Sequence, residues 1–345
     1  MKIDNDSFQA PETGRPCARS DGLPTVALIA TVYNCRDELK QSLSGFVSER
    51  NVALVDEIVI SDGGSTDGTW ELLQQHADAI PKFRPVREKG ANICRGRNMA
   101  IQASTGEILV LFDSGTTYCE GWLDQMLKPF REDAGIDVVE GITEPVGSGT
   151  FQEALCHLGG VGANLHSQLP QGASHRCIAY RRRVWEQVGG YPEHVRAGED
   201  TWFNARLRKL GMSIRFVPEA RCYWDVRGDF RSLWRMQYRN TRGHVELRGN
   251  WGTGRIYAIA SVYLVVATLA VCGIWHPVAW VFGAGLYLAY LGHRLLRKGR
   301  RGHFLNPLHF AMGTAILACL DCALVLACLN YARSRLASAR ENRLE

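Results

Sequence analysis

Two aspartates in the first third of the chain directly follow short apolar segments and open loops of small residues. Asp62 follows EIVIS (57–61) and begins DGGSTDGT, and Asp113 follows EILVLF (107–112) and begins DSGTT. Glycine-rich loops let the backbone approach a ligand closely, so a carboxylate in such a loop can serve a binding site. Aspartate is also a preferred helix N-cap, and capping alone would explain one such residue.

A third acidic position lies further along, in GGYPEHVRAGEDTWFNARLRKLG (189–211). There Glu199 and Asp200 directly precede a predicted helix, where the helix dipole favours negative charge. The position by itself therefore does not distinguish a proton acceptor from a stabilised helix start. The apolar side of this helix is expected to comprise Trp202 or Phe203, Leu207 and Leu210.

The elements that would position these acids alternate between strand-like and helix-like patterns. Apolar runs predict buried strands, and apolar residues at helical spacing predict the helices between them. This alternation predicts a parallel sheet with helices on both faces, and ligands bind beyond the carboxyl ends of such strands. The strands are expected at 25–33, 56–61 and 107–112, and the helices at 34–49, 67–77 and 93–104. Two acids at the same predicted edge favour a binding function over capping.

The composition is that of a soluble domain followed by an apolar region. The first 23 residues are polar and rich in Pro and Gly, which predicts a disordered leader rather than a signal peptide. The net charge of +5 is mild, and no nucleic-acid partner is expected. The eleven cysteines lack the spacing of a disulfide framework or a zinc site, which favours reduced thiols in the cytosol.

Six segments of the first two thirds, in order, resemble the motifs of family 2 glycosyltransferases. These are inverting enzymes of the GT-A fold, an α/β fold with a mostly parallel sheet, and they use nucleotide-diphosphate sugars. The resemblance covers about residues 24–225. The matching segments are TVYN (31–34), SDGGSTDGT (61–69), KGANICRGRNMA (89–100), FDSGTTYCEGWL (112–123), CIAYRRRVWEQVGGYPE (177–193) and GEDTWFNARLRKLG (198–211).

The resemblance implies a role for each matching residue on the donor side. Asp62 matches the aspartate that hydrogen-bonds the donor base, and Thr31 to Tyr33 match the strand end that lines its pocket. Asp113 matches the first acid of the DxD motif, which faces the ribose and diphosphate and binds the metal. Arg97 is likewise assigned to the nucleotide.

On the acceptor side, Asp200 matches the general base that deprotonates the attacking hydroxyl, with Glu199 beside it. A base opposite the leaving group and neutralisation of the diphosphate are the two functions that this displacement needs. Trp202 and Arg239 are weaker assignments to the acceptor or the diphosphate. The implied reaction is one in-line displacement with inversion at the anomeric carbon.

The DxD motif departs from the family pattern, because it reads Asp113-Ser114-Gly115 and lacks its last acid. In the family that acid commonly holds a divalent cation, Mg²⁺ or Mn²⁺. Either Asp113 holds the cation alone, since Mg²⁺ accepts one or two protein carboxylates, or a basic group replaces part of its function. The basic residues considered are Arg95, Arg97, Arg181 and Arg182.

The stretch RMQYRNTRG (235–243) weakly resembles the QRxRWxRG motif of polymer-forming members. Arg239 fits, whereas Asn240 replaces the Trp that grips the acceptor, so transfer of a single sugar is expected. The alternative is an amphipathic helix at a membrane surface, and residues 226–255 are expected to form such an interfacial helix or linker.

Residues 256–330 predict about three transmembrane helices, at 256–275, 278–296 and 305–330, followed by a basic tail at 331–345. Basic flanks around the first two predict a hairpin whose ends face the cytoplasm, with a cytoplasmic catalytic domain on a multi-pass plasma-membrane protein. Asp321 interrupts the third segment, at a cost of ~2.5–3.5 kcal/mol at a helix centre. It would contact a lipid-linked acceptor or form a buried helix–helix hydrogen bond.

The sequence therefore predicts a membrane-anchored inverting glycosyltransferase of cell-envelope or polysaccharide synthesis. It would move one sugar from a nucleotide donor, a UDP-sugar being expected, onto a lipid-linked saccharide or glycolipid. The acceptor pocket is expected to include residues 151–176. The alternatives are a non-catalytic nucleotide-binding membrane scaffold and, with less support, a transporter.

Overall fold

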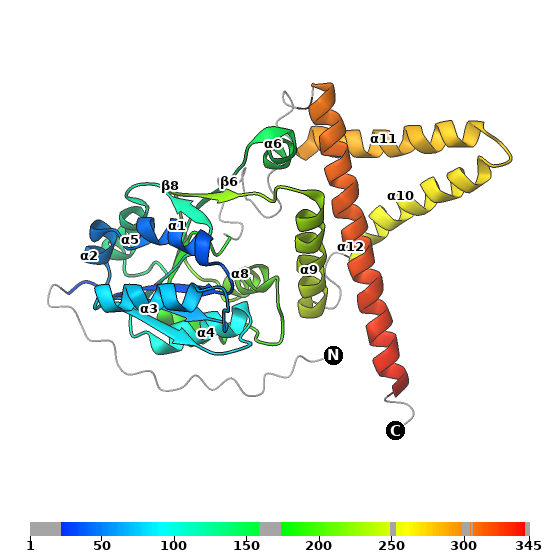
Figure 1. Ribbon diagram of the computed structural model, residues 1–345. Coiled ribbons are helices and arrows are strands. Elements are labelled where there is room, and N and C mark those ends of the chain that lie inside the picture. The colour runs from blue at the N-terminus through cyan, green and yellow to red at the C-terminus, as the bar shows by residue number, and fades with distance from the viewer. Residues whose placement is uncertain (1–21, 159–173, 249–252, 299–303, 305, 342–345) are drawn as a thin grey trace. The chain divides into compact units, whose positions relative to one another are not determined.

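The computed structural model describes residues 22–158, 174–248, 253–298, 304 and 306–341 (Figure 1). The chain divides into two compact units: residues 1–144 with 163–225, and residues 145–162 with 226–345. The predicted leader lies almost entirely outside the described residues, as does much of the predicted acceptor segment.

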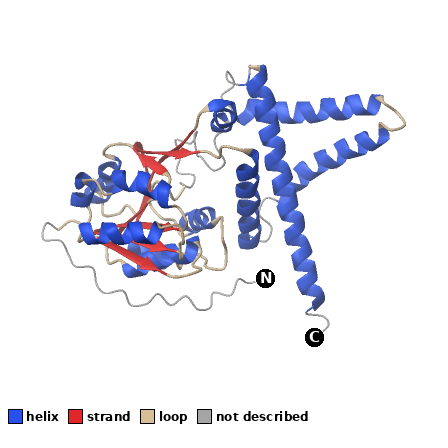
Figure 2. Cartoon of the chain, in the orientation of Figure 1, coloured by secondary structure: helices blue, strands red, loops and turns tan. Residues whose placement is uncertain are grey.

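The first unit is built on one sheet with the strand order β3-β2-β1-β4-β7-β6-β8-β5, and Figure 2 shows the strands among their helices. The strands are β1 (Val26–Val32), β2 (Glu57–Asp62), β3 (Phe83–Arg87), β4 (Ile108–Leu111), β5 (Thr116–Tyr118), β6 (Val138–Val146), β7 (Ile178–Arg181) and β8 (Ile214–Asp225). The helices are α1 (Arg36–Phe46), α2 (Glu49–Leu54), α3 (Thr69–Ala79), α4 (Ile93–Ala103), α5 (Trp122–Glu132), α7 (Arg182–Val188) and α8 (Glu199–Lys209).

The predicted α/β architecture is confirmed, and the sheet is mixed rather than mostly parallel. Strands β3, β2, β1 and β4 pair in parallel, whereas β7 pairs antiparallel with β4 and with β6, and β5 antiparallel with β8. The parallel part corresponds to the strand–helix alternation of the first 112 residues. Parallel strands must be joined by crossover connections, usually helices, and the helices between these strands provide them.

The core lies where the apolar runs of the sequence predicted strands buried on both faces. Strands β1 and β4 are apolar almost throughout, and Leu28, Ile29 and Val110 are completely buried. Helix α1 places Leu39 and Leu43 against this layer, as its helical spacing predicted.

Helix α4 packs closely on the strands that carry the predicted site. A Cβ atom added at Gly96 would lie 2.1 Å from Thr31 Oγ1 and 2.9 Å from Ser61 Oγ. Replacing Gly96 with alanine is therefore expected to lower the free energy of unfolding by about 1–3 kcal/mol through overpacking. The matched control is Gly45→Ala on α1, where nothing lies within 4 Å of the added atom. Urea unfolding of both variants tests the contrast, and equal stability would contradict it.

The second unit consists of helices α6 (Gly149–His157), α9 (Phe230–Arg248), α10 (Thr253–Cys272), α11 (Val278–Lys298) and α12 (Pro307–Glu341). Helix α9 packs along α12, and its residues Leu233 and Met236 are buried. The amide of Asn330 on α12 donates a hydrogen bond to the hydroxyl of Tyr238 at 3.0 Å. The apolar side of α9 is thus covered by protein, which leaves its exposed arginines as the polar face.

By length and composition, α12 is the one described helix that could cross a membrane, over Pro307–Arg335. In α10 the apolar stretch Ser261–Cys272 is shorter. The segments expected at 256–275 and 278–296 form the helices α10 and α11, and the three-crossing arrangement stays a prediction.

Asp321 on α12 is buried in a polar cluster between helices. Its carboxylate pairs with Arg294 of α11 and accepts hydrogen bonds from Tyr290, at 3.4 Å, and Tyr263 of α10, at 3.5 Å. Arg294 also donates to the Tyr290 hydroxyl at 3.0 Å. Of the two roles considered for Asp321, the buried contact between helices is the one present.

Candidate functional site

Three ends of neighbouring parallel strands bring the donor-side residues to one edge of the sheet. Thr31 is the penultimate residue of β1 and lies opposite Ser61 of β2, Asp62 ends β2, and Asp113 follows β4 after one further residue. Tyr33 lies just beyond β1 and is 63% exposed. Because the site edge of an open α/β sheet lies beyond these strand ends, the predicted grouping of Thr31, Asp62 and Asp113 is present.

Asp62 is completely buried and its carboxylate is occupied by the protein itself. It accepts hydrogen bonds from the Ser65 backbone N–H at 3.1 Å and from the Ser65 hydroxyl, and it pairs with Arg87 Nε at 3.0 Å. In this arrangement Asp62 holds the glycine-rich loop in place, and its contact with a donor base stays a prediction.

Capping does not explain the two strand-end acids. Helices α3 and α5, which follow Asp62 and Asp113, have Gly68 and Gly121 at their N-caps, both in the left-handed region. The N-cap explanation that the sequence left open is therefore wrong for these two residues.

Asp113 lies between two guanidinium groups. Its Oδ1 is 3.4 Å from Arg97 Nη2 on α4, and its Oδ2 is 3.7 Å from Arg176 Nε just before β7. The Asp113 and Arg176 side chains are about a quarter exposed, whereas Arg97 is buried. The sequence predicted Asp113 and Arg97 here, whereas Arg176 was expected only as the last residue of the acceptor segment 151–176 and not beside Asp113.

The acids at the start of α8 meet the same arginine. Gly198 holds the left-handed N-cap position with φ +83°, and Glu199 pairs with Arg97 Nη1 at 2.8 Å. Asp200 follows with a partly exposed side chain, and its Oδ1 accepts a hydrogen bond from the Thr201 N–H at 2.6 Å. Glu199 thus anchors the helix start, while Asp200 stays accessible beside it.

Arg97 therefore joins the donor-side acid Asp113 to Glu199 of α8, which is 102 positions from Arg97 in the sequence. Burial raises the pKa of Glu199, and the charge of Asp200 adds to this, whereas Arg97 acts in the opposite direction. Burial alone would lower the pKa of Arg97, but the charges of Glu199 and Asp113 raise it. Arg97 therefore remains charged, and Arg97 and Glu199 form a buried ion pair.

Three buried ring side chains, those of Tyr191, Tyr180 and His175, form a hydrogen-bonded cluster that packs against Arg97. Its guanidinium lies 5.4 Å from the centre of the Tyr191 ring. The Tyr191 hydroxyl contacts Tyr180 at 3.1 Å and His175 Nδ1 at 2.8 Å. Burial, followed by the nearby charge of Arg97, lowers the pKa of His175 to about 3, so this histidine is neutral near pH 7.

The depressed pKa of His175 predicts a loss of stability in mild acid. The unfolded chain takes up a proton at its ordinary value near 6.5 and the folded chain does not, so stability falls as pH drops below ~6.5. Between about pH 7.5 and 5.5 this group alone is expected to cost about 1.4 kcal/mol. Urea unfolding of the protein and of His175→Gln at both pH values measures it. An equal pH dependence in the two proteins would contradict the assignment.

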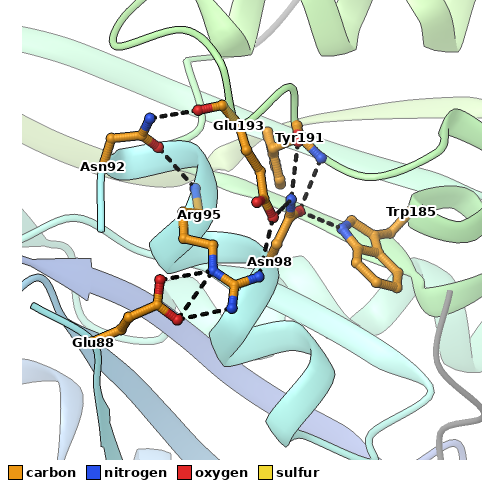
Figure 3. A network of polar contacts seen from close by, with 7 residues as sticks. All are labelled: Glu88, Asn92, Arg95, Asn98, Trp185, Tyr191 and Glu193. Carbon is orange, nitrogen blue, oxygen red and sulfur yellow. Dashed lines mark hydrogen bonds and ion pairs between the residues drawn. The ribbon is translucent and has the colours of Figure 1, made fainter. Parts of the chain in front are cut away.

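Figure 3 shows a second network, which fixes the segment 191–193 on α4. The Asn98 side-chain carbonyl accepts hydrogen bonds from Trp185 Nε1 at 3.1 Å and from the Tyr191 N–H at 2.9 Å, and its amide donates to Glu193 at 2.9 Å. Arg95 pairs with Glu88 at 2.8 Å and with Glu193 at 3.5 Å. Arg95 is thus committed to this network rather than to Asp113.

The remaining arginines considered for the diphosphate lie at the wrong end of the sheet. Arg181 pairs with Ile108, the first residue of β4, whereas Asp113 lies beyond the last. The buried guanidinium of Arg182 donates to the Gly106 and Ile101 carbonyls, both at 2.9 Å. The prediction of a diphosphate role for Arg181 and Arg182 is therefore wrong.

The two weaker acceptor assignments are not brought together with the acids by any contact described. Trp202 is half-buried on α8 and stacks with Arg206 at 5.4 Å. Arg239 is exposed on α9, in the second unit. Leu210, expected on the apolar side of α8, lies just after its last residue, Lys209, and is 45% exposed. The roles of Trp202 and Arg239 stay predictions.

The residues around Asp113 do not fit a resident divalent cation as they stand. No cluster of three or more ligating His, Cys, Asp or Glu side chains occurs within the described part of the chain. Each Asp113 oxygen faces a guanidinium, and Gly115 occupies the position of the missing acid. A cation bound to Asp113 would have to displace an arginine and remain close to the other one, at a Coulomb cost.

The glycine at 115 has a conformational reason. Gly115 adopts φ +74° in the turn between β4 and β5, and a Cβ there would come no closer than 3.8 Å to Glu38. The backbone favours glycine, although space for a side chain exists and aspartate tolerates this region better than most residues.

Two family models match the chain. The model described as "Glycosyl transferase family 2" matches residues 27–189, and "Glycosyl transferase family group 2" matches residues 134–331, which is more than half of the chain. Glycosyltransferase AglE of Haloferax volcanii is 26% identical over 70% of this chain and 81% of its own length. Succinoglycan biosynthesis protein ExoA of Rhizobium meliloti is 29% identical over 55% of this chain and 60% of its own length.

Among solved structures, the mannosyltransferase PcManGT from Pyrobaculum calidifontis, in complex with GDP-Man and Mn²⁺, shares the fold. Its TM-score is 0.55 at 19% identity, with 88% of this chain and 87% of that chain covered. At this identity the likeness shows the fold alone, and it agrees with the mixed sheet and flanking helices described above. The matching family models, with the GT-A architecture, identify the chain as a glycosyltransferase of family 2.

Proposed function

We propose that this enzyme transfers a single sugar from a nucleoside-diphosphate sugar to a lipid-linked saccharide or glycolipid, in the assembly of a polysaccharide or cell-envelope glycan. The observation that carries the proposal is the double pairing of Arg97, with Asp113 at 3.4 Å and with Glu199 at 2.8 Å. It brings the sheet edge that would hold a donor next to the helix start that would hold a base.

In the proposed reaction Asp200 accepts the proton of the acceptor hydroxyl. The hydroxyl oxygen forms a bond to the anomeric carbon while the bond from that carbon to the diphosphate oxygen breaks. The nucleoside diphosphate leaves with the electron pair, and the configuration at the carbon inverts. A partly exposed carboxylate beside a buried, anchored neighbour suits a general base, because it is accessible and held in position.

For the donor we propose a UDP-sugar first, with a GDP-sugar as the second choice because the structural neighbour was solved with GDP-Man. Thr31 and Tyr33 would line the pocket of the base, and the exposed Tyr33 ring offers a stacking surface.

For the location we propose a plasma-membrane protein with its catalytic unit in the cytoplasm. The apolar length of α12 supports this, as does a group of exposed apolar side chains around the turn between α10 and α11. These include Ile274, Trp275, Trp280, Val281 and Phe282. A lipid-linked acceptor would then be presented at the surface of the same membrane.

The test is transfer by the full-length protein in membranes from labelled UDP-, GDP- and dTDP-sugars, with lipid extract as acceptor. Label appearing in a lipid-soluble product from one donor, with the opposite anomeric configuration by NMR, is the expected result. Label in a water-soluble polymer would contradict single-sugar transfer to lipid. Failure of every donor to bind or react would reject the proposed donor site.

A further inference from the structure

Among the described residues, three contacts hold the Arg176 side chain in place. Its Nε lies 3.7 Å from Asp113 Oδ2, its Nη1 donates to Ser174 Oγ at 2.8 Å, and its guanidinium lies 4.3 Å from the centre of the Trp224 ring. Stacking on an indole fixes the plane of the guanidinium and leaves its edge for other partners. The side chain is 24% exposed, so the charge is restrained but reachable.

Of the two arginines beside Asp113, Arg176 is the one that an anion could reach. Two guanidinium groups, Arg97 and Arg176, lie within salt-bridge distance of Asp113, and the position that carries a second acid in the family motif is Gly115. Arg97 is additionally shared with Glu199, whereas Asp113 is the only acid within salt-bridge distance recorded for Arg176 in the described residues. The 3.7 Å contact with Asp113 is longer than a hydrogen bond, so a diphosphate arriving at this edge would meet a guanidinium that still has N–H groups to donate.

We propose that Arg176 binds the diphosphate of the donor and supplies the positive charge that a divalent cation would otherwise provide, so that the enzyme binds nucleoside diphosphates without a metal ion. This inference rests on the proposed function, because it assumes that the donor binds at Asp113. A guanidinium can give two parallel hydrogen bonds to phosphate oxygens, which fixes the leaving group and neutralises its charge together.

The experiment is calorimetric titration of the full-length, detergent-purified protein with UDP and with GDP, each in EDTA and in Mn²⁺. The expected result is binding of one nucleotide with the same affinity in both buffers. Arg176→Gln is expected to weaken binding in EDTA by about 10- to 100-fold, the range for loss of a hydrogen bond to a charged group. The matched control is Arg183→Gln, which removes an exposed arginine paired with Asp137 at 2.9 Å.

A second variant separates the loss of a contact from the loss of the fold. Arg176→Lys keeps the charge but not the paired donors, and it is expected to bind more weakly than the parent and more tightly than Arg176→Gln. Thermal unfolding of all variants is measured in parallel. If Arg176→Gln unfolds at a clearly lower temperature than the parent protein, the nucleotide affinity of Arg176→Lys is compared with that of the parent instead.

The outcomes distinguish this inference from the proposed function. Nucleotide binding only with Mn²⁺ would overturn the metal-free role of Arg176 while leaving the donor site intact. Unchanged affinity of Arg176→Gln in EDTA would likewise overturn it. Absence of binding in both buffers would reject the donor site itself, and with it the basis of the inference.

Discussion

Replacing Asp200 with asparagine is expected to reduce sugar transfer by about 10²- to 10⁴-fold, the usual contribution of a general base. Asparagine keeps the size and the capacity to accept a hydrogen bond from the Thr201 N–H, but it cannot take a proton at neutral pH. Nucleotide binding is expected to be unchanged, because the donor contacts assigned here lie at the sheet edge. Single-turnover transfer and calorimetric nucleotide titration of the same preparation measure the two effects.

The control for this substitution is Asp78→Asn, at an exposed position on α3 away from the strand ends. It should transfer sugar at the rate of the parent protein. Transfer that survives in Asp200→Asn would show that another group is the base. A loss of nucleotide binding together with transfer would point to a disturbed site instead.

Replacing Arg97 with glutamine is expected to lower the free energy of unfolding by about 3–5 kcal/mol, because it leaves a buried charge without its partner. Glu199 is only 6% exposed and is paired with Arg97 at 2.8 Å, so water cannot take over the role of the guanidinium. Denaturant unfolding of the full chain, followed by tryptophan fluorescence, measures the change.

A double variant identifies the cause. Arg97→Gln with Glu199→Gln removes both charges and is expected to recover much of the lost stability, since neutral side chains can hydrogen-bond in the same space. The control Arg95→Gln breaks a pair that is over a third exposed, and it should cost only about 0–1 kcal/mol. If the double variant is no more stable than Arg97→Gln, the ion pair is not what stabilises the two elements.

Local patterns were enough to predict three of the four parallel strands, whereas β3 (Phe83–Arg87), with its arginines and proline, was not predicted. The runs at 25–33, 56–61 and 107–112 became β1, β2 and β4, because continuous apolar sequence between helical segments permits little else. The same patterns put Asp62 and Asp113 at one edge, since parallel neighbours end on the same side.

The pairing of arginines with acids could not be predicted in the same way. Arg87 reaches Asp62 from β3, and Arg176 reaches Asp113 from a segment more than sixty positions away in the chain. Neither pair has a local signal, because both depend on which strands become neighbours. For Arg176 that neighbour is β7, which joins the sheet antiparallel to β4, where strand–helix alternation no longer guides the prediction.

The pair of Arg294 and Asp321 has a consequence for how the chain is made. Helix α11 is synthesised before α12, so Arg294 has no contact with Asp321 until α12 has been made. A truncated chain that ends before α12 lacks Asp321, so Arg294 would have to stay exposed or be buried without this carboxylate, and burying it alone is costly. In the complete chain Arg294 and Asp321 neutralise each other, so we expect cellular proteases to degrade truncated chains faster than complete ones.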